Sequence, residues 1–411
     1  MARKTLQLGG LMSVLALFSA QVSALPFSPI EPRSFALGGT GVSSGSNANA
    51  GFLNPALLAV NERDEALVLH APILGYRYFD KQNVMDSLAN YQRIGAESAY
   101  DTALNDFNNA ININESLVNI GGWANVMRTR IPDLANKAVQ QEFMAAAVVG
   151  IPHEKLNMTF SLSSRVLGGG VVDIADSDLT ELDRIIKAAG DASLLSGELF
   201  DSRAFASRFR GRGLSTTELA LSMARQYSFA GHDIAVGVTP KYIQATSFDY
   251  ATYIDAADYE TDLNEKSHSA FDVDVGAAKS YGNGWSTGVA IKNLIGQKYQ
   301  TSLGNEIRIK PQARIGISHA MKWVAVAVDM DLNKSQSLGF DSETQYLGIG
   351  AELNVFDMST IRIGYRSNMS DVDTSLATVG LGIKVYGVQV DLAAGANEDE
   401  IDFAAQASFR F

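Results

Sequence analysis

The amino-acid sequence predicts an all-β membrane protein, an antiparallel outer-membrane β-barrel of about fourteen strands. Three observations lead to this fold class. The chain begins with a pattern typical of a secretory signal, and no later segment is apolar enough for a membrane-spanning helix. Most of the remainder alternates apolar with polar residues in segments of about ten residues. A chain that enters a membrane without an apolar helix has to enter it as a closed barrel.

The composition agrees with such a barrel. Apolar residues make up 46% of the 411 residues, charged residues make up 19%, and the mean hydropathy is +0.01. Strands that present alternate residues to lipid and to water average to values of this kind. The chain has no cysteine, which excludes disulfides, cysteine-zinc sites and thiol chemistry.

Residues 1–24 are expected to be a signal peptide. Arg3 and Lys4 form its charged start, residues 11–18 its apolar stretch, and residues 22–24 (Val-Ser-Ala) a small-residue cleavage site. Loss of the two basic residues would change the formal net charge from −12 to −14. Because nucleic-acid binding normally requires a basic surface, no direct nucleic-acid partner is expected.

Several alternating segments place charged residues on one face and apolar residues on the other. In residues 271–275 (Phe-Asp-Val-Asp-Val) and 361–366 (Ile-Arg-Ile-Gly-Tyr-Arg), the apolar face would meet lipid and the charged face would meet the lumen. The same parity runs through residues 308–317. The residues expected to line the lumen are therefore Asp272, Asp274, Arg308, Lys310, Arg314, Arg362 and Arg366.

The links between these segments alternate in length. Links after odd-numbered strands are long, whereas those after even-numbered strands are short, as at residues 152–154, 231, 282–283 and 356–357. With a periplasmic N-terminus, every long link falls outside the cell, as in outer-membrane barrels. The predicted strands lie near residues 66–72, 141–151, 155–166, 215–229, 232–244, 268–279, 284–294, 307–318, 321–331, 343–354, 358–367, 376–386, 387–396 and 401–411.

The last segment places Phe403, Phe409 and Phe411 on one face, with a terminal aromatic residue at the membrane interface. Phe409 and Phe411 resemble the C-terminal signal that the outer-membrane assembly machinery reads. That machinery is therefore an expected partner.

Two long links have helical rather than strand periodicity. They cover residues 80–137 and 177–210, where apolar residues recur at helical spacing. Asp178 would cap the helix in the second link, and Gly190 would end it. Both links are expected to form helical external loops that cap the pore.

The segment between the signal and the first strand, residues 25–60, is small, glycine-rich and neutral. It contains Arg-Ser-Phe-Ala-Leu-Gly-Gly-Thr-Gly at residues 33–41 and Asn-Pro-Ala at residues 54–56. A stretch of this kind can fold compactly inside a narrow lumen, where bulky side chains would not fit.

On these residues the sequence resembles the FadL-like outer-membrane barrels, which carry long-chain fatty acids and other hydrophobic molecules. Within that superfamily it resembles the branch of the conjugal transfer protein TraF, which shares the Arg-Ser-x-Ala-x-Gly-Gly-x-Gly opening and the Asn-Pro-Ala. The resemblance implies an N-terminal plug inside a fourteen-stranded wall formed by residues 61–411. It assigns plug roles to Gly38, Gly39, Gly41, Asn54, Pro55 and Ala56.

The resemblance also implies a lateral opening in the third strand of the wall. Residues 168–170 (Gly-Gly-Gly), which follow the predicted strand, are the candidate for it. A plain glycine loop is the alternative.

Motifs of enzymes and metal sites are incomplete. Residues 284–288 (Gly-Trp-Ser-Thr-Gly) match the hydrolase elbow, but they open an alternating strand instead of a strand-to-helix turn. Asp329, Asp331 and Asn333 begin like a calcium loop that lacks its glycine and its final glutamate. The five histidines have no ligand spacing. No enzymatic activity, metal or cofactor is expected.

Two segments in the predicted loops are candidate contact sites. Arg203, Arg208, Arg210 and Arg212 would bind lipopolysaccharide phosphates, or they form a solvated loop face. Residues 248–263 combine three tyrosines with four aspartates, which suits an apolar or sugar ligand at the entrance, or a mobile acidic loop.

Two functions follow as hypotheses. The first is passive transport of a hydrophobic or amphipathic small molecule in the manner of FadL-like channels, with the external loops for capture and the plug as a gate. The alternative is a structural or interaction component of conjugative transfer or envelope assembly. Outer-membrane lipid and lipopolysaccharide are expected partners in both.

Overall fold

The computed structural model describes residues 31–46, 48–60, 67–151, 156–194, 199, 201–229, 232–255, 265–335, 338, 343–355, 358–371 and 374–411. The expected signal peptide, residues 1–24, and the expected turns at residues 152–154, 231 and 356–357 lie outside the described residues.

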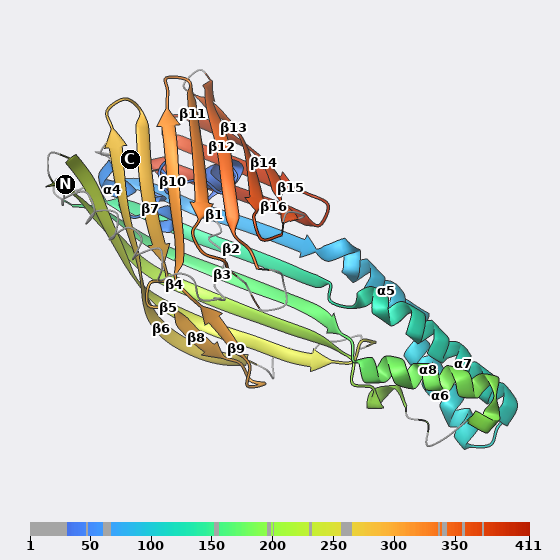
Figure 1. Cartoon of the computed structure of the whole chain (residues 1–411). Helices are drawn as coiled ribbons and strands as arrows, with labels where there is room; N and C mark the ends of the chain where they lie inside the picture. Colours follow the sequence, from blue (N-terminus) through green and yellow to red (C-terminus); the bar gives the residue numbers. More distant parts are fainter. Residues whose placement is uncertain are drawn as a thin grey trace, which may run out of the picture.

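Within these residues, fourteen antiparallel strands form one closed barrel (Figure 1). Strand β1 pairs with β16 to close the wall, and β7 pairs with β10 because β8 and β9 form a separate small sheet. Closure leaves no unpaired strand edge, as a sheet in hydrocarbon requires. The wall strands are β1 (Val68–Asp80), β2 (Ala138–Ile151), β3 (Asn157–Asp173), β4 (Arg208–Phe229), β5 (His232–Thr252), β6 (Glu265–Tyr281), β7 (Trp285–Lys292), β10 (Gln312–Ala320), β11 (Val324–Asp331), β12 (Tyr346–Val355), β13 (Ser359–Asn368), β14 (Leu376–Val385), β15 (Val388–Ala396) and β16 (Glu400–Arg410).

The predicted fold class is confirmed, since each predicted strand overlaps one wall strand. Four strands extend seven or eight residues beyond their predicted bounds. β1 continues to Asp80, β3 to Asp173 and β5 to Thr252, and β4 already begins at Arg208. These extensions project beyond the other strands (Figure 1). Outside a lipid belt the outward positions need not be apolar, so the alternation that identifies a strand fades there.

The two ends of the barrel differ in their connections. At one end, here called the helical end, the chain inserts helices between β1 and β2 and between β3 and β4, and the β8–β9 hairpin between β7 and β10. At the other, the turn end, β6 and β7 are joined by three residues, and β14 and β15 by two. Val68 pairs with Arg410, so the chain enters and leaves the wall at the turn end.

The inserted helices form a projecting helical arm. It comprises η2 (Lys81–Asn83), α5 (Val84–Ile94), α6 (Ala96–Asn108), α7 (Ile113–Arg130), η3 (Ile131–Leu134), α8 (Asp176–Gly190), η4 (Ala192–Leu194) and η5 (Ser202–Ala204). Buried apolar residues such as Tyr100, Ile120, Met127 and Leu182 form its core. The expectation that these links cap the pore was wrong, because the arm extends away from the barrel on the long strands (Figure 1).

Asp178 is also not the cap of α8. It lies inside the helix, which begins at Asp176 and has Ala175 as its N-cap residue. The Asp178 carboxylate instead accepts hydrogen bonds from the backbone nitrogens of Ala206 (3.0 Å) and Ser207 (2.6 Å). Gly190 ends the helix, as predicted.

The outer face of the wall is apolar. Large side chains at outward positions are about half exposed, for example Phe403 (54%), Val379 (57%) and Ile363 (59%). Their inward neighbours Asp402, Thr378 and Arg362 are buried. This parity gives the barrel a lipid-compatible surface and a polar interior.

Among the described residues, no helix has the length and apolar character needed to cross a membrane.

Candidate functional site

The described part of the N-terminal segment lies inside the barrel (Figure 1). It forms three short helices, α2 (Pro32–Ala36), α3 (Ala50–Leu53) and α4 (Leu57–Val60). Helix α2 packs against β13 to β16, and α4 packs against β3 to β6. The segment therefore reaches from one side of the lumen to the other, and residues 31–60 are called the plug below.

Local chemistry shapes the beginning of the plug. Glu31 caps α2, with its carboxylate oxygens accepting from the backbone nitrogens of Ser34 (2.8 Å) and Arg33 (2.9 Å). Pro32 starts the helix, where a missing N–H costs nothing. Gly38 and Gly39 end it with φ values of +70° and +84°, a conformation that favours glycine. The chain thereby reverses within a few residues and stays inside the lumen.

Glycines on the inner wall make room for the plug. A Cβ at Gly276 would collide with the side chain of Asn54, and a Cβ at Gly288 with the carbonyl group of Val42. A Cβ at Gly364 would collide with the backbone of Gly38. The wall glycines whose Cβ would come closer than 3.0 Å to the plug, here called the glycine belt, are Gly237, Gly276, Gly288, Gly348, Gly350, Gly364 and Gly380. Close packing of this kind leaves no room for a path between belt and plug in this state.

Asn54 connects the two halves of the plug to the wall. Its Nδ2 donates to the carbonyl oxygens of Val42 (2.8 Å) and Ala277 (3.2 Å), and its Oδ1 accepts from the nitrogen of Ala56 (3.1 Å). The side chain is fully buried. A buried amide whose donor and acceptor are both used fixes one arrangement of the surrounding chain.

Charged wall residues hold the glycine turn of the plug. The Asp329 carboxylate accepts from the backbone nitrogens of Gly41 (2.7 Å) and Val42 (2.8 Å). Arg314 donates to the carbonyl oxygen of Gly39 (2.8 Å) and forms an ion pair with Asp331 (2.6 Å). Hydrogen bonds to ionised groups are stronger than neutral ones. The glycine turn of the plug is therefore held to the wall by charge-assisted hydrogen bonds.

A chain of ion pairs continues from the plug into the wall. Arg33 pairs with Glu352 (2.9 Å), Glu352 with Arg362 (2.6 Å), and Arg362 with Asp391 (2.7 Å). The two arginines and two carboxylates balance in charge. Buried charges of this kind are tolerated only when they are paired and hydrogen-bonded.

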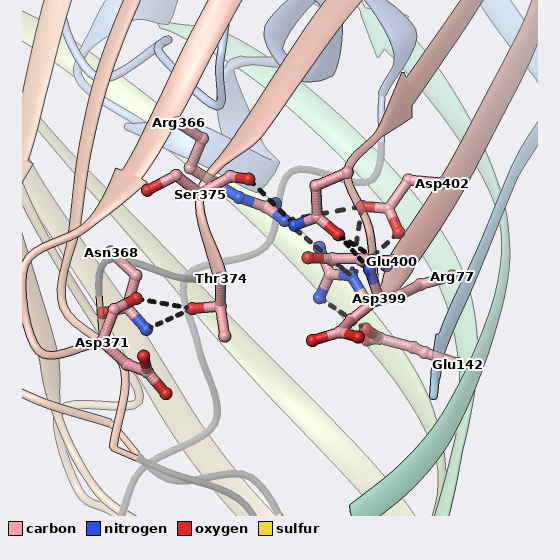
Figure 2. Close-up of polar contacts among 11 residues, drawn as sticks. Arg77, Glu142, Arg366, Asn368, Asp371, Thr374, Ser375, Asp399, Glu400 and Asp402 are labelled. Atoms are coloured by element: carbon pink, nitrogen blue, oxygen red, sulfur yellow. Dashed lines mark hydrogen bonds and ion pairs between the residues drawn. The ribbon is translucent and has the colours of Figure 1, made fainter. Parts of the chain in front are cut away.

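A second ion-pair cluster lies near Asp80 and Glu400, where β1 ends and β16 begins at the helical end. Figure 2 shows its residues. Arg77 contacts Glu142 (3.1 Å), Glu400 (2.8 Å) and Asp402 (3.2 Å), while Arg366 contacts Glu400 (2.9 Å) and Asp402 (3.5 Å). The cluster, here called the Arg77 cluster, joins β1, β2, β13 and β16 across the lumen face of the seam between the first and last strands.

The β8–β9 hairpin, β8 (Gln297–Gln300) and β9 (Glu306–Ile309), covers an apolar patch inside the mouth at the helical end. Tyr299, Ile307 and Ile309 of the hairpin are buried in one cluster with wall residues. Those wall residues, here called the lumen patch, are Leu167, Leu214, Ile243 and Ala245 at inward positions of β3 to β5. An apolar patch on the lumen face is unusual for a water-filled pore.

Polar wall residues hold the hairpin over the patch. Asp272 accepts from the nitrogen of Ile295 (3.0 Å) and Asp274 from that of Asn293 (2.7 Å), both in the loop before β8. Asp249 accepts from Thr301 (2.7 Å) and Asn305 (2.8 Å) in the loop that connects β8 to β9. The hairpin is thus fastened at both of its ends.

The structure places most of the residues expected to line the lumen on the inner wall. Asp272, Asp274, Arg314, Arg362 and Arg366 are all buried there, in the contacts described above.

Arg308 and Lys310 are exceptions to this placement. Arg308 lies on β9, pairs with Glu306 (2.6 Å), and its side chain is 47% exposed. Lys310 lies between β9 and β10. The first part of the predicted wall strand at 307–318 was wrong. Polar and apolar residues alternate in a loop hairpin as they do in a wall strand, so the sequence pattern does not separate the two.

Several residues at the site were missed by the sequence analysis. Arg77 lies in the part of β1 beyond its predicted end, and Glu142, Glu352, Glu400 and Asp402 lie at inward positions of wall strands or at their ends. The alternation that singled out Arg362 would have included Glu352 and Asp402. Asp329 appeared only as part of an incomplete calcium motif.

Gly168, Gly169 and Gly170 do not form a loop or an opening. They lie within β3 and pair with β2 on one side and with β4 on the other, so the wall is continuous there. The basic cluster is divided between two elements, and Arg203 lies on η5 in the link between β3 and β4. Arg208 to Arg212 belong to β4, where Arg210 pairs with Asp173 (2.9 Å).

The base of the helical arm holds a buried carboxyl group. Tyr91 on α5 donates to Glu97 on α6 (2.8 Å). Burial and the nearby carboxylate of Asp255, after the end of β5, raise the pKa of Glu97 to about 8. Glu97 is therefore largely protonated at neutral pH.

The closed fourteen-stranded wall around an internal plug is the fold of the FadL-like outer-membrane barrels, and solved channels of this fold are similar to this chain. The crystal structure of the toluene transporter TbuX from Ralstonia pickettii is 12% identical with a TM-score of 0.52, and the match covers 93% of this chain and 98% of that chain. A deltaS2S3 mutant of the monoaromatic hydrocarbon channel TodX is 10% identical with a TM-score of 0.52, and the match covers 93% of this chain and 99% of that chain. A TodX deltaS2 mutant is 9% identical with a TM-score of 0.50, covering 92% and 96%.

Within that class the chain belongs to the family described as F plasmid transfer operon, TraF, protein, whose model matches residues 51–331. No curated protein matches the sequence. The expected resemblance to FadL-like barrels and to their TraF branch is confirmed.

Proposed function

We propose that the protein is an outer-membrane channel for the passive passage of a small hydrophobic or amphipathic molecule, described here in its closed state. The helical end would face the outside and the turn end the periplasm, because outer-membrane barrels carry their longer loops outside. A cleaved signal peptide, residues 1–24, and an assembly signal at Phe409 and Phe411 are part of this proposal.

The observation that carries the proposal is the lumen patch under the β8–β9 hairpin. If the hairpin moves outward, Leu167, Leu214 and Ile243 present a contiguous apolar surface to the lumen. A hydrophobic molecule gains free energy there by leaving water, at roughly 25 cal/mol per Å² of apolar surface buried. The toluene and monoaromatic hydrocarbon channels of the same fold support this choice.

The plug would be the second gate on the path. It is fixed by hydrogen bonds and ion pairs to Asp329, Arg314 and Glu352, none of which is among the hydrogen bonds that pair the wall strands. Plug residues Gly38, Gly39, Gly41, Asn54, Pro55 and Ala56 lie at its contacts with the wall or at its turns. Rearrangement of these contacts would open a path toward the periplasm.

Uptake of radiolabelled toluene by cells producing the protein tests this function. Leu214→Ala should reduce uptake by about fivefold, because truncation removes a large share of the apolar contact. Leu219→Ala on the same strand is the control, since Leu219 is 44% exposed on the outer face. A second experiment measures the single-channel conductance of the barrel in a planar bilayer. Deletion of residues 34–58, which removes most of the plug, should raise this conductance. Unchanged uptake in Leu214→Ala together with unchanged conductance after the deletion would refute the channel.

The second candidate function is an interaction component of conjugative transfer or envelope assembly. The helical arm favours it, because a well-packed projection beyond the barrel serves no obvious purpose in transport (Figure 1). The TraF family membership points the same way. Replacement of residues 84–130 by a short linker should then lower mating frequency while toluene uptake persists. Normal mating in that strain argues against this role.

A further inference from the structure

A groove of about 680 Å³ crosses the outer face of the barrel near the seam between the first and last strands. Its walls come from β1, β2 and β13 to β16, and none of its lining residues is charged. The volume falls in the range of small-molecule binding sites, roughly 300 to 1,000 Å³. The groove is separate from the lumen, because its lining residues on β1 and β14 to β16 are all paired with neighbouring strands.

Two alanines create the groove. Ala405 on β16 lies between Leu74 and Leu392 on the neighbouring strands, and Ala394 on β15 lies between Phe403 and Val379. All six are at outward positions. The four neighbours are large, and each is at least 38% exposed, so they stand above the two methyl groups as rims. The result is a narrow apolar trough within the lipid-facing surface of the barrel.

The shape and position of the trough favour a single flexible hydrocarbon chain. A second copy of the barrel would need a broad complementary surface, whereas projecting rims with a narrow floor suit a chain that can follow the depression. The groove is continuous with the apolar outer face, and most of it lies toward the helical end: Phe403 is three residues from Glu400, where β16 begins. In the proposed orientation this half of the wall contacts the outer leaflet.

We propose that the groove binds one acyl chain of lipopolysaccharide. The proposal uses the orientation in the proposed function but not the transport activity. Van der Waals contact along the trough holds the chain, and the rims limit its lateral exchange. Bound lipopolysaccharide would stabilise the seam at which the barrel closes.

The test measures lipid retained by the full-length protein after purification from outer membranes in mild detergent. 3-Hydroxy fatty acids, which mark lipopolysaccharide, and ordinary fatty acids, which mark phospholipid, are quantified per barrel. Ala405→Phe fills the groove and should reduce the retained 3-hydroxy fatty acid by about tenfold. Ala407→Phe, on the same outward face of β16 but outside the groove, should retain it.

Each other outcome overturns the proposal. The proposal is wrong if both variants retain equal amounts of 3-hydroxy fatty acid, or if only ordinary fatty acids are retained. It is also wrong if the protein runs as a dimer on a native gel and Ala405→Phe disrupts that dimer. Ala394→Leu provides a second filling variant if Ala405→Phe fails to show the heat-modifiable band of a folded barrel. Toluene uptake is measured on the same strains, so that failure of the transport proposal is recognised separately.

Discussion

One carboxylate oxygen of Asp329, on wall strand β11, lies 2.7 Å from the backbone nitrogen of Gly41 in the plug. The same oxygen accepts from Val42 at 2.8 Å. The two contacts join a wall strand to a segment almost 290 residues earlier in the chain. Because both donors are main-chain groups, the anchor depends on the position of the plug turn and not on the side chains within it.

Asp329→Ala should therefore loosen the plug. A hydrogen bond to a charged group contributes about 1.5 to 3 kcal/mol, so the open fraction should rise by roughly tenfold or more. Single-channel recording in planar bilayers measures this as more frequent openings. Asp191→Ala, an exposed aspartate of the helical arm, is the control. A closed probability equal to that of the wild type would show that Asp329 does not retain the plug.

Gly276→Ala should displace the plug by a different route, because the added methyl group would occupy the place of the Asn54 amide. Overpacking of this kind costs about 1 to 3 kcal/mol. The expected signs are a lower unfolding temperature and a larger conductance. Gly168→Ala is the matched control, a strand glycine whose new methyl group would meet nothing within 4 Å. Equal behaviour of the two variants would mean that the glycine belt does not position the plug.

Arg77→Met should destabilise the barrel through the Arg77 cluster. It leaves three buried carboxylates with fewer cations, and loss of one partner of a buried pair costs about 3 to 5 kcal/mol. The midpoint of the heat-induced gel shift should fall, and adding Asp402→Asn should restore part of the loss. Arg308→Met removes an exposed pair that contributes roughly 0 to 1 kcal/mol and should leave the midpoint in place. A midpoint unaffected by Arg77→Met would contradict this role.

The barrel could be predicted from sequence because its signal is local. Lipid on one side and water on the other impose a period of two on every wall strand, and this period is visible within ten residues. The strands near Phe271 and Ile361 show it plainly. Where the outer face leaves the lipid, as in β4 near Arg210, nothing imposes the period of two, and the predicted strand therefore began seven residues too late.

The site was less predictable because its contacts are not local. Arg77 meets Asp402, 325 residues away, and nothing in the alternation of either strand selects its partner. Arg308 shows the converse error. It alternates as a wall residue does, but belongs to a hairpin that folds over the lumen patch. The glycine belt is likewise recognisable only when the plug is placed against it.

The helical arm should be sensitive to pH through Glu97. Burial and Asp255 raise the pKa of Glu97 from 4.5 to about 8, so the folded arm binds this proton more tightly than the unfolded chain does. The free energy of unfolding of the arm therefore falls as the pH rises from about 4.5 to about 8. Above about pH 8 the contribution of Glu97 no longer changes with pH. Asp255, Asp101 and the Tyr91 hydroxyl group face the Glu97 carboxyl group, and ionisation would place a new charge beside the two carboxylates.

Hydrogen exchange of α5 and α6 at pH 6 and pH 9, corrected for the intrinsic rate, measures this effect. Protection should be lower at the higher pH in the wild type and similar at both in Glu97→Gln, which keeps an acceptor for Tyr91 but cannot ionise. Strands β12 to β16 of the same sample provide an internal reference far from the arm. If Glu97→Gln loses as much protection as the wild type, another group controls the arm, and the buried carboxyl group is only a packing residue.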